Sequence, residues 1–249
     1  NLGISIPEDK DLIKRVEELI KIEKYEMGNS ILLADQIPND ILILINGTIR
    51  QLINNPLNGN VITLGLQKGP YVIGNKSLRS DYPLEFVTAA TDCELARLKV
   101  KDWDRLINLY SEKELNSEIV FPDEILPFLL KDYKNLFTKN IKDIRSKLNK
   151  IAALSNAREL THKDNFKKIN LDDENKWFLA TNFQFMPYGT HIEFSSIEIL
   201  KEKSKSFRII GIPKNILGIS SVGEKTTVNP ILESDKHKNE ASYRKNEDS

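Results

Sequence analysis

This chain of 249 residues has few cysteines and histidines, and it has no formal net charge. The single cysteine, Cys93, excludes an internal disulfide and a zinc site built from several cysteines. A chain without disulfides fits a reducing, cytosolic compartment. Basic and acidic residues both number 36, so the formal net charge is zero. That balance gives no general attraction to nucleic acid or to an anionic membrane.

Long hydrophobic runs are also missing. No apolar run approaches the about 18 residues that a membrane-spanning helix needs. The first residues, NLGISIPEDKD, are acidic where a secretory signal peptide is basic, and they lack an initiating methionine. We therefore expect a cytoplasmic protein, and we expect the chain to be a piece of a longer one.

Residue patterns that carry catalysis are sparse as well. The histidines, His162, His191 and His237, are scattered over different predicted elements, so we expect no metal site. GISSVGEKTT comes close to a phosphate-binding loop but has Glu224 where that loop needs lysine. The acids Asp172, Asp173 and Glu174 are adjacent and cannot all face one site, which favours a loop. We expect no enzymatic activity from this chain, and we predict that Cys93 is a buried structural thiol.

Glycine is present in number, but it is concentrated in the first third of the chain. Seven of the 11 glycines lie at or before Gly74, where most of them separate short apolar runs. The predicted strands are ILILING, TIRQLI, VITLGL, YVIG, EFVTAA and CELARL. NNPLNGN joins two of them and predicts a hairpin, because Asn-Gly supplies positive φ. The fold class predicted is mainly β with α (α+β), an antiparallel β jelly-roll barrel with flanking helices.

Helical periodicity surrounds this region. Apolar spacing predicts helices over Glu8–Ile22 and Lys101–Glu118, then over Asp123–Asn135 and Thr138–Leu154. FPDE breaks the helical pattern and restarts it, with Pro122 near a first turn. A seam along the last helix indicates a helix docked on its own domain; its residues are Phe137, Ile141, Ile144, Leu148 and Ile151.

Beyond Asn170 the pattern returns to strands. WFLATNFQFM, HIEFSSIEIL and FRIIGIP predict a small second sheet, and the polar tail from Ser220 predicts disorder. The predicted division is 1–115 for the jelly roll with its N-terminal and capping helices, 116–169 for a helical segment, 170–219 for a small β segment, and 220–249 for a disordered tail or linker.

Three stretches in this order resemble the cyclic-nucleotide-binding domain of catabolite activators, kinase regulatory subunits and gated channels. They are KYEMGNSILLADQIPNDILILINGTIRQL, GLQKGPYVIGNKSL and VTAATDCELARLKVKDWDRLI, and together they cover about Ile22 to Leu109. The first is closed by Gly47, and the second carries Gly69 and Gly74. The resemblance implies an eight-stranded jelly roll with a phosphate cassette after Gly74. Backbone N–H groups at a short helix would hold the phosphate there.

The acid and the base that such a cassette uses are replaced here. The resemblance places a ribose-binding Glu directly after the glycine, where this chain has Asn75, and a phosphate-binding Arg at Pro83 or Leu84, which Glu85 follows. Arg79 is the nearest other cation. The cassette therefore predicts a degenerate pocket, and binding of cyclic AMP or cyclic GMP in the family's usual way is disfavoured. The candidate ligand-binding residues are Gly74, Asn75, Lys76, Ser77, Leu78, Arg79, Leu84, Glu85 and Phe86.

Three aromatic residues are candidates for stacking on a base. They are Tyr71, Phe86 and Phe194, and burial in the core is the simpler explanation for aromatics in β segments. We expect no cofactor, with a cyclic nucleotide as the ligand left open.

A narrower resemblance concerns ADQIPNDILILINGTIRQLINNPLNGNVITLGLQKGPYVIGNKSL. This stretch is similar to the N-terminal module of bacterial ABC exporters that carry a papain-like peptidase domain. It implies a non-catalytic regulatory or interaction module at the cytosolic face of the inner membrane. Its partners would be other domains or subunits of the exporter, with contact to the membrane only through a downstream region. A homodimer stays open.

Two alternatives are kept. One is a genuine cyclic-nucleotide sensor, and the other is a catabolite-activator-like transcription regulator. FPDE interrupts the long helix that such a regulator needs, so nucleic acid is not favoured as a partner.

The run from Lys131 to Lys150 has seven basic and two acidic residues, an excess of five. It could meet an anionic lipid surface, another domain or nucleic acid, or be a solvated helix face.

Overall fold

The computed structural model describes residues 14, 17–55, 57–102, 119–137, 140–161 and 171–219. Eight strands and one short helix are the elements whose full bounds the structure describes in the first part of the chain. The strands are β1 (Lys21–Tyr25), β2 (Ser30–Leu32), β3 (Asp40–Asn46), β4 (Thr48–Asn54), β5 (Val61–Lys68), β6 (Tyr71–Ile73), β7 (Phe86–Ala89) and β8 (Cys93–Lys99). The helix α2 (Asn75–Ser80) lies between β6 and β7.

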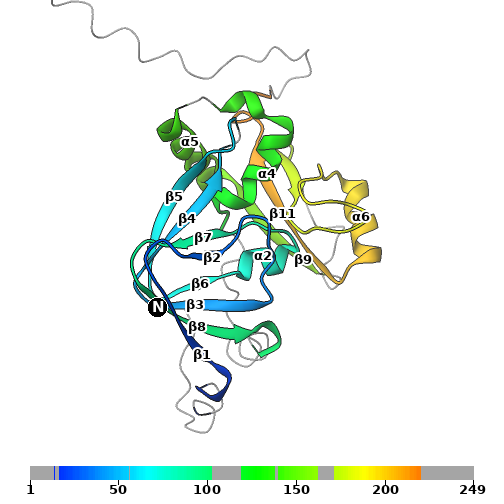
Figure 1. Ribbon diagram of the computed structural model, residues 1–249. Helices are drawn as coiled ribbons and strands as arrows, with labels where there is room; N and C mark the ends of the chain where they lie inside the picture. The colour runs from blue at the N-terminus through cyan, green and yellow to red at the C-terminus, as the bar shows by residue number, and fades with distance from the viewer. Residues whose placement is uncertain are drawn as a thin grey trace, which may run out of the picture.

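These strands pair as two four-stranded antiparallel sheets, in the orders β1-β8-β3-β6 and β2-β7-β4-β5. That pairing is the order of a jelly roll, with two facing sheets rather than a closed barrel. Figure 1 shows the two sheets stacked over each other, with α2 at one end. The predicted hairpin joins β4 to β5, and its Gly59 has φ 73°. The predicted fold class is confirmed.

The second part of the chain adds helices and a third sheet. Its elements are α4 (Pro122–Asp132), the short 3-10 helix η1 (Lys134–Leu136), α5 (Ile141–Leu154), β9 (Asn156–Thr161), β10 (Asn175–Leu179), α6 (Phe194–Lys203) and β11 (Ser206–Pro213). The three strands pair antiparallel in the order β10-β11-β9. Pro122 occupies the first turn of α4, as FPDE predicted. None of the helices described is long and apolar enough to cross a membrane.

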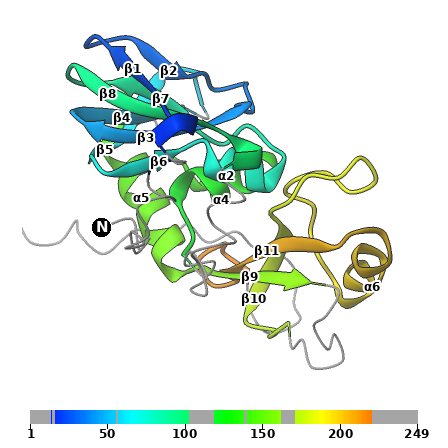
Figure 2. The same cartoon turned by 90° about the horizontal axis from the view of Figure 1, so that it is seen from below.

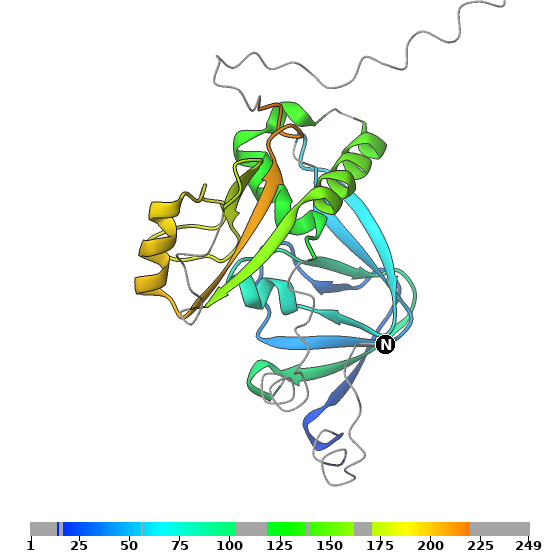
Figure 3. The same cartoon turned by 180° about the vertical axis from the view of Figure 1, so that it is seen from behind.

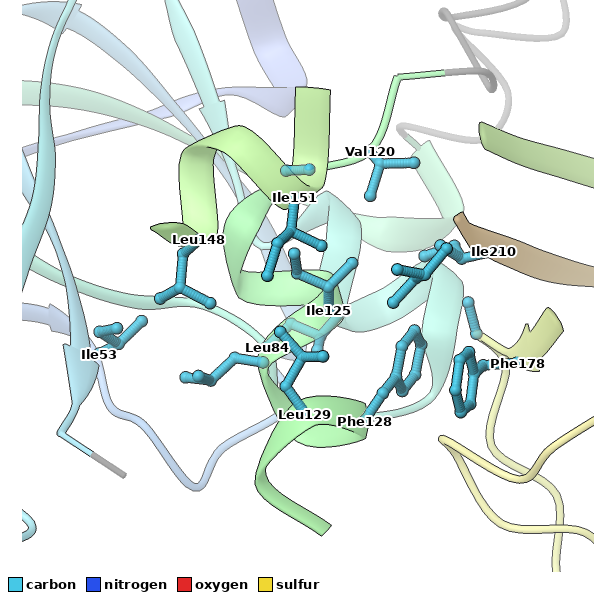
Figure 4. Close-up of a cluster of buried hydrophobic side chains, with 14 of the residues drawn as sticks. Ile53, Leu84, Val120, Ile125, Phe128, Leu129, Leu148, Ile151, Phe178 and Ile210 are labelled. Atoms are coloured by element: carbon cyan, nitrogen blue, oxygen red, sulfur yellow. The ribbon is translucent and has the colours of Figure 1, made fainter. Parts of the chain in front are cut away.

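A single hydrophobic cluster joins the jelly roll to the second part. Ile53 and Leu84 from the jelly roll meet Ile125 of α4, Ile151 of α5 and Ile210 of β11 (Figure 4). Figure 2, seen from below, shows α4 and α5 between the jelly roll and the third sheet, and Figure 3 shows the same arrangement from behind. Apolar side chains of the jelly roll, of the helices α4 and α5 and of the third sheet share this core. Burial of the core therefore stabilises all of these elements together.

The seam predicted on α5 is largely buried against this cluster. Phe137, Ile144, Leu148 and Ile151 are at most 6% exposed, whereas Ile141 at the start of the helix is 51% exposed. The helix therefore packs on its own protein along the predicted face, except at Ile141.

Two predictions for the second part were wrong. HIEFSSIEIL was predicted as a strand, but Phe194–Lys203 form the helix α6, which buries Ile197 and Leu200 three residues apart. The residues Asn156–Thr161 were assigned to a helical segment, but they form β9. This strand buries Ala157 and Leu160 and pairs with β11. Hydrogen bonding to β11, which lies far away in the sequence, therefore determines the extended conformation of these residues.

The N-terminal helix was predicted to run to Ile22, but Lys21 and Ile22 belong to β1. They pair with Arg97 and Ala96 of β8, and hydrogen bonding to that strand overrides the helical pattern. The rest of the predicted helix lies largely outside the described residues. So do Trp103–Glu118, His162, and the tail from Ser220 with His237 and Glu224.

Candidate functional site

The cassette begins where β6 ends. Gly74 precedes α2 and has φ 95°, a left-handed conformation that favours glycine. A Cβ atom built there would lie 2.8 Å from Cγ of Pro38, so the chain also passes too closely for a larger residue. The turn into α2 therefore depends on glycine both for its backbone angle and for space.

The buried carboxylate of Glu85 binds the N-terminal end of α2. Its Oε1 accepts a hydrogen bond from the backbone N–H of Gly74 at 2.9 Å, and its Oε2 accepts one from the N–H of Ser77 at 3.1 Å. The Ser77 hydroxyl in turn accepts from the backbone N–H groups of Leu84 and Glu85, each at 3.1 Å. Glu85 is only 3% exposed. Two backbone donors at the start of α2 are thus bonded to a carboxylate of the same chain.

The charge on this carboxylate is balanced locally. Burial raises the pKa of Glu85 above its ordinary value, while the Lys76 ammonium and the two backbone N–H groups act in the opposite direction. Lys76 itself is buried and forms an ion pair with Asp123 at the start of α4. Burial alone would lower the pKa of Lys76, but the nearby carboxylates of Asp123 and Glu85 outweigh it, so this pKa is raised. The ammonium also lies 4.8 Å from the ring centre of Phe121.

Arg79 points to α4 and not to the mouth of the cassette. Its Nη2 lies 3.2 Å from Oε1 of Glu124, and Nε of Arg208 on β11 lies 3.2 Å from the same oxygen. The side chains of Glu124 and Arg208 are both fully buried. Arg208 also donates to the carbonyl oxygen of Ile119 at 2.8 Å. Arg79 is therefore engaged in a buried ion-pair network that ties α2 to α4 and to the third sheet.

Aromatic contacts reinforce the same junction. Tyr82, just after α2, stacks on Tyr188 with ring centres 4.4 Å apart, and the Tyr188 hydroxyl donates to the carbonyl oxygen of Glu124 at 2.9 Å. Burial raises the pKa of Tyr188 well above its ordinary value, so its hydroxyl stays protonated as the donor. The cassette is thus bound to α4 by ionic, polar and aromatic contacts.

The remaining predicted residues serve in different ways. Asn75 is half-buried at the first position of α2, and Leu78 packs beside Ile41 and Leu98. Leu84 is buried in the shared core, and Phe86 is half-buried at the start of β7.

The candidate stacking aromatics do not gather in one place. The Tyr71 hydroxyl accepts a hydrogen bond from Gln51 at 2.5 Å on the inner side of the jelly roll. Phe194 is on α6, beside the third sheet, and is 51% exposed. A shared base-stacking site formed by these two rings is therefore not present. Cys93 is a buried free thiol, as predicted.

The residues that sequence reasoning missed are Asp123, Glu124 and Arg208, which the fold brings to the cassette from more than 40 residues away. FPDE gave one signal, because two acids at the start of a helix can meet cations.

No family model matches the sequence, and neither does any curated protein. Similar solved structures include the catabolite activator protein of Thermus thermophilus, at 20% identity and a TM-score of 0.36, over 41% of this chain and 48% of that one. PKAR CBD2 with bound Sp-2Cl-cAMPS is similar at 18% identity and a TM-score of 0.36, over 57% and 80% of the two chains. PfPKA-R with bound cAMP is similar at 12% identity and a TM-score of 0.37, over 83% and 75%.

This chain spans about half the length of the Thermus protein. The solved structures that it resembles thus include cyclic-nucleotide-binding domains of regulatory proteins, and the bound ligands are properties of those proteins.

Proposed function

We propose that this chain is a non-catalytic regulatory or interaction module of cyclic-nucleotide-binding-like fold whose cassette is filled by its own carboxylate. The observation that carries the proposal is the pair of hydrogen bonds from the backbone N–H groups of Gly74 and Ser77 to Glu85. These donors are the groups that a cassette of this type would offer to a phosphate. With Glu85 bonded to both, they have no free hydrogen to give to a ligand.

Electrostatics supports the same proposal. A cyclic phosphate entering the cassette would have to displace a buried carboxylate or lie beside it, and like charges at close range repel. The cations that could offset this repulsion are already paired, Lys76 with Asp123 and Arg79 with Glu124. A cyclic nucleotide would therefore find the N–H groups of Gly74 and Ser77 and the charges of Lys76 and Arg79 already paired.

Contacts to α4 support a role in transmitting or receiving a conformational bias. The cassette is joined through Lys76 and Arg79 to Asp123 and Glu124, and through Glu124 to Arg208 on the third sheet. A partner that binds α4 or the third sheet would act on the cassette through these buried pairs, and the reverse also holds. In the exporter context suggested by the sequence, that partner is another domain or subunit of the exporter on its cytosolic side.

The test for the cassette is thermal unfolding of the 249-residue chain with cyclic AMP and with cyclic GMP at millimolar concentration. A ligand at about 100 times its dissociation constant adds about 2.7 kcal/mol of stability. We expect no resolvable shift of the unfolding midpoint with either nucleotide. An upward shift of several degrees with one of them would overturn the proposal and make the chain a genuine sensor.

The test for the exporter context is independent of the first. The coding sequence next to this chain should contain a peptidase region followed by membrane-spanning and ATP-binding regions. Finding a DNA-binding domain there would contradict the proposed partners, and salt-dependent binding of the chain to duplex DNA would point to a transcription regulator.

A further inference from the structure

A pocket away from the cassette is lined by residues of the β4–β5 hairpin and of α5. The pocket has a volume of about 470 Å³ and is lined by Arg50, Thr63, Gly65, Leu66 and Arg145. Arg50 comes from β4, Arg145 from α5, and the other three residues from β5. Figures 1 and 3 both show α5 beside the upper ends of β4 and β5. No residue of this pocket belongs to the cassette.

Two arginines without partners face this pocket. Within the part of the chain that the structure describes, the guanidinium groups of Arg50 and Arg145 make no hydrogen bond and no ion pair, whereas Arg79, Arg97 and Arg208 each pair with a carboxylate. Both residues are exposed, and Lys142 lies one turn before Arg145 on the exposed face of α5. The pocket therefore brings together positive charge that the described part of the molecule leaves unbalanced.

Gly65 contributes no side chain to the wall of the pocket, although the neighbouring atoms leave room for one. A Cβ atom built on Gly65 would meet only Oε1 of Gln51 at 3.8 Å and Nε2 of Gln67 at 4.0 Å, which are ordinary contact distances. The register of the hairpin shifts opposite this residue, between Gln51 and Leu52. Glycine inside a strand weakens it, and it often marks a bulge, as the shifted register shows here, or a place where a ligand or another backbone comes close.

The lining also sets the kind of molecule that fits. Planar guanidinium groups from two elements suit the oxygens of a phosphate, and the Thr63 hydroxyl adds a further donor. A phosphate ion alone would leave most of about 470 Å³ empty, and the volume lies in the range of small-molecule sites. Leu66, which is 59% exposed, offers an apolar wall for the rest of the ligand.

We propose that this pocket binds a phosphate ester, with the phosphate held by Arg50 and Arg145 and the organic part resting on Gly65 and Leu66. The ester can be a soluble small molecule or a lipid headgroup, because both present the same chemistry to the arginines. The site is separate from the cassette, so it does not depend on whether Glu85 excludes a cyclic nucleotide.

Binding of phenyl phosphate to the 249-residue chain, followed by calorimetry at low ionic strength, tests the proposal. Inorganic phosphate is the second probe, and vesicles of phosphatidylcholine with and without phosphatidic acid are the third. The variants are Arg50→Gln, Arg145→Gln and Gly65→Val, with Lys99→Gln as a matched control that removes one exposed positive charge outside the pocket. Circular dichroism and the unfolding midpoint check that each variant is folded.

We expect saturable binding of phenyl phosphate, tighter than that of inorganic phosphate, and a dissociation constant raised about tenfold or more by either arginine variant. Gly65→Val should weaken binding by placing a branched side chain where the organic part rests, while Lys99→Gln should leave it unchanged. Binding to phosphatidic acid vesicles alone, lost in both arginine variants, would identify a lipid headgroup as the source.

Three results would overturn the proposal: no saturable binding to any probe, arginine variants that behave like Lys99→Gln, or inorganic phosphate binding as tightly as phenyl phosphate. If Gly65→Val does not fold, the two arginine variants still decide the outcome.

Discussion

At the scale of single residues, Glu85 satisfies two backbone donors at the start of α2, the N–H groups of Gly74 and Ser77. Replacing it with Gln keeps the size but puts an amide N–H₂ where one backbone N–H now finds an oxygen. It also removes the negative charge beside Lys76. We expect Glu85→Gln to destabilise the chain by about 2 kcal/mol, the usual loss for a hydrogen bond to a charged group.

Urea unfolding of Glu85→Gln measures this cost, with Glu202→Gln on the exposed face of α6 as the control. Equal stabilities of the two variants would contradict the role given to Glu85.

Glu159 gives a prediction about pH. Burial raises its pKa above the ordinary value, and the positive charges of Arg79 and Arg208 offset this only in part. Because the folded-state pKa is the higher one, the unfolded chain releases this proton first, and stability falls as pH rises through the folded-state pKa. Glu159→Gln removes that fall. The variant should therefore gain stability relative to the natural chain between about pH 4 and about pH 7.

Urea unfolding of both chains across this pH range measures the difference. A gap that stays constant, or that moves against the variant as pH rises, would show that Glu159 has no raised pKa.

At the scale of elements, the ion pair between Lys76 and Asp123 joins α2 to α4 in a buried setting. Removing one partner leaves the other charge buried and unpaired, which typically costs 3–5 kcal/mol. We expect Lys76→Met to destabilise by about 3 kcal/mol, and the double variant Lys76→Met with Asp123→Asn to recover part of that loss.

A double-mutant cycle by urea unfolding gives the coupling between the two side chains. Additive effects of the two single changes would rule out a direct energetic link between α2 and α4 through this pair.

The same scale shows why some elements could be predicted and others could not. The jelly-roll strands are short apolar runs between glycine-bearing turns, so local pattern and final environment agree. In α6, the alternation in IEIL imitates a strand, while the spacing of Ile197 and Leu200 determines the buried face. β9 has only Ala157 and Leu160 to bury, and its conformation depends on pairing with β11, about 50 residues later.

The candidate site divides in the same way. The cassette residues from Gly74 to Glu85 could be named from a local motif. Their partners Asp123, Glu124 and Arg208 could not, because no short-range pattern says which distant acid meets which base. Sequence alone placed Glu85 directly after the position where the resemblance expects the phosphate-binding Arg. It did not reveal that the carboxylate turns inward and bonds to the backbone.

At the scale of the whole molecule, the shared core predicts that the jelly roll and the third sheet unfold together. Ile144 of α5 is 1% exposed, and Ile141 on the same helix is 51% exposed, which makes a matched pair. We expect Ile144→Ala to cost about 2–5 kcal/mol and Ile141→Ala much less. A single transition, with equal midpoints by tryptophan fluorescence and by circular dichroism, would support one cooperative unit.

Two separate transitions, with only the later one sensitive to Ile144→Ala, would instead show that the jelly roll folds independently of the helices.

The inward position of Glu85 also bears on how the molecule responds to its surroundings. A carboxylate that is part of the chain competes with any free anion as if it were present at a high effective concentration, which for short tethers is of millimolar order or above. A metabolite at cellular levels would have to overcome that concentration before it gained a single bond. Under the proposed function, the state of the cassette is therefore set by the amino-acid sequence and does not change with the concentration of a free anion.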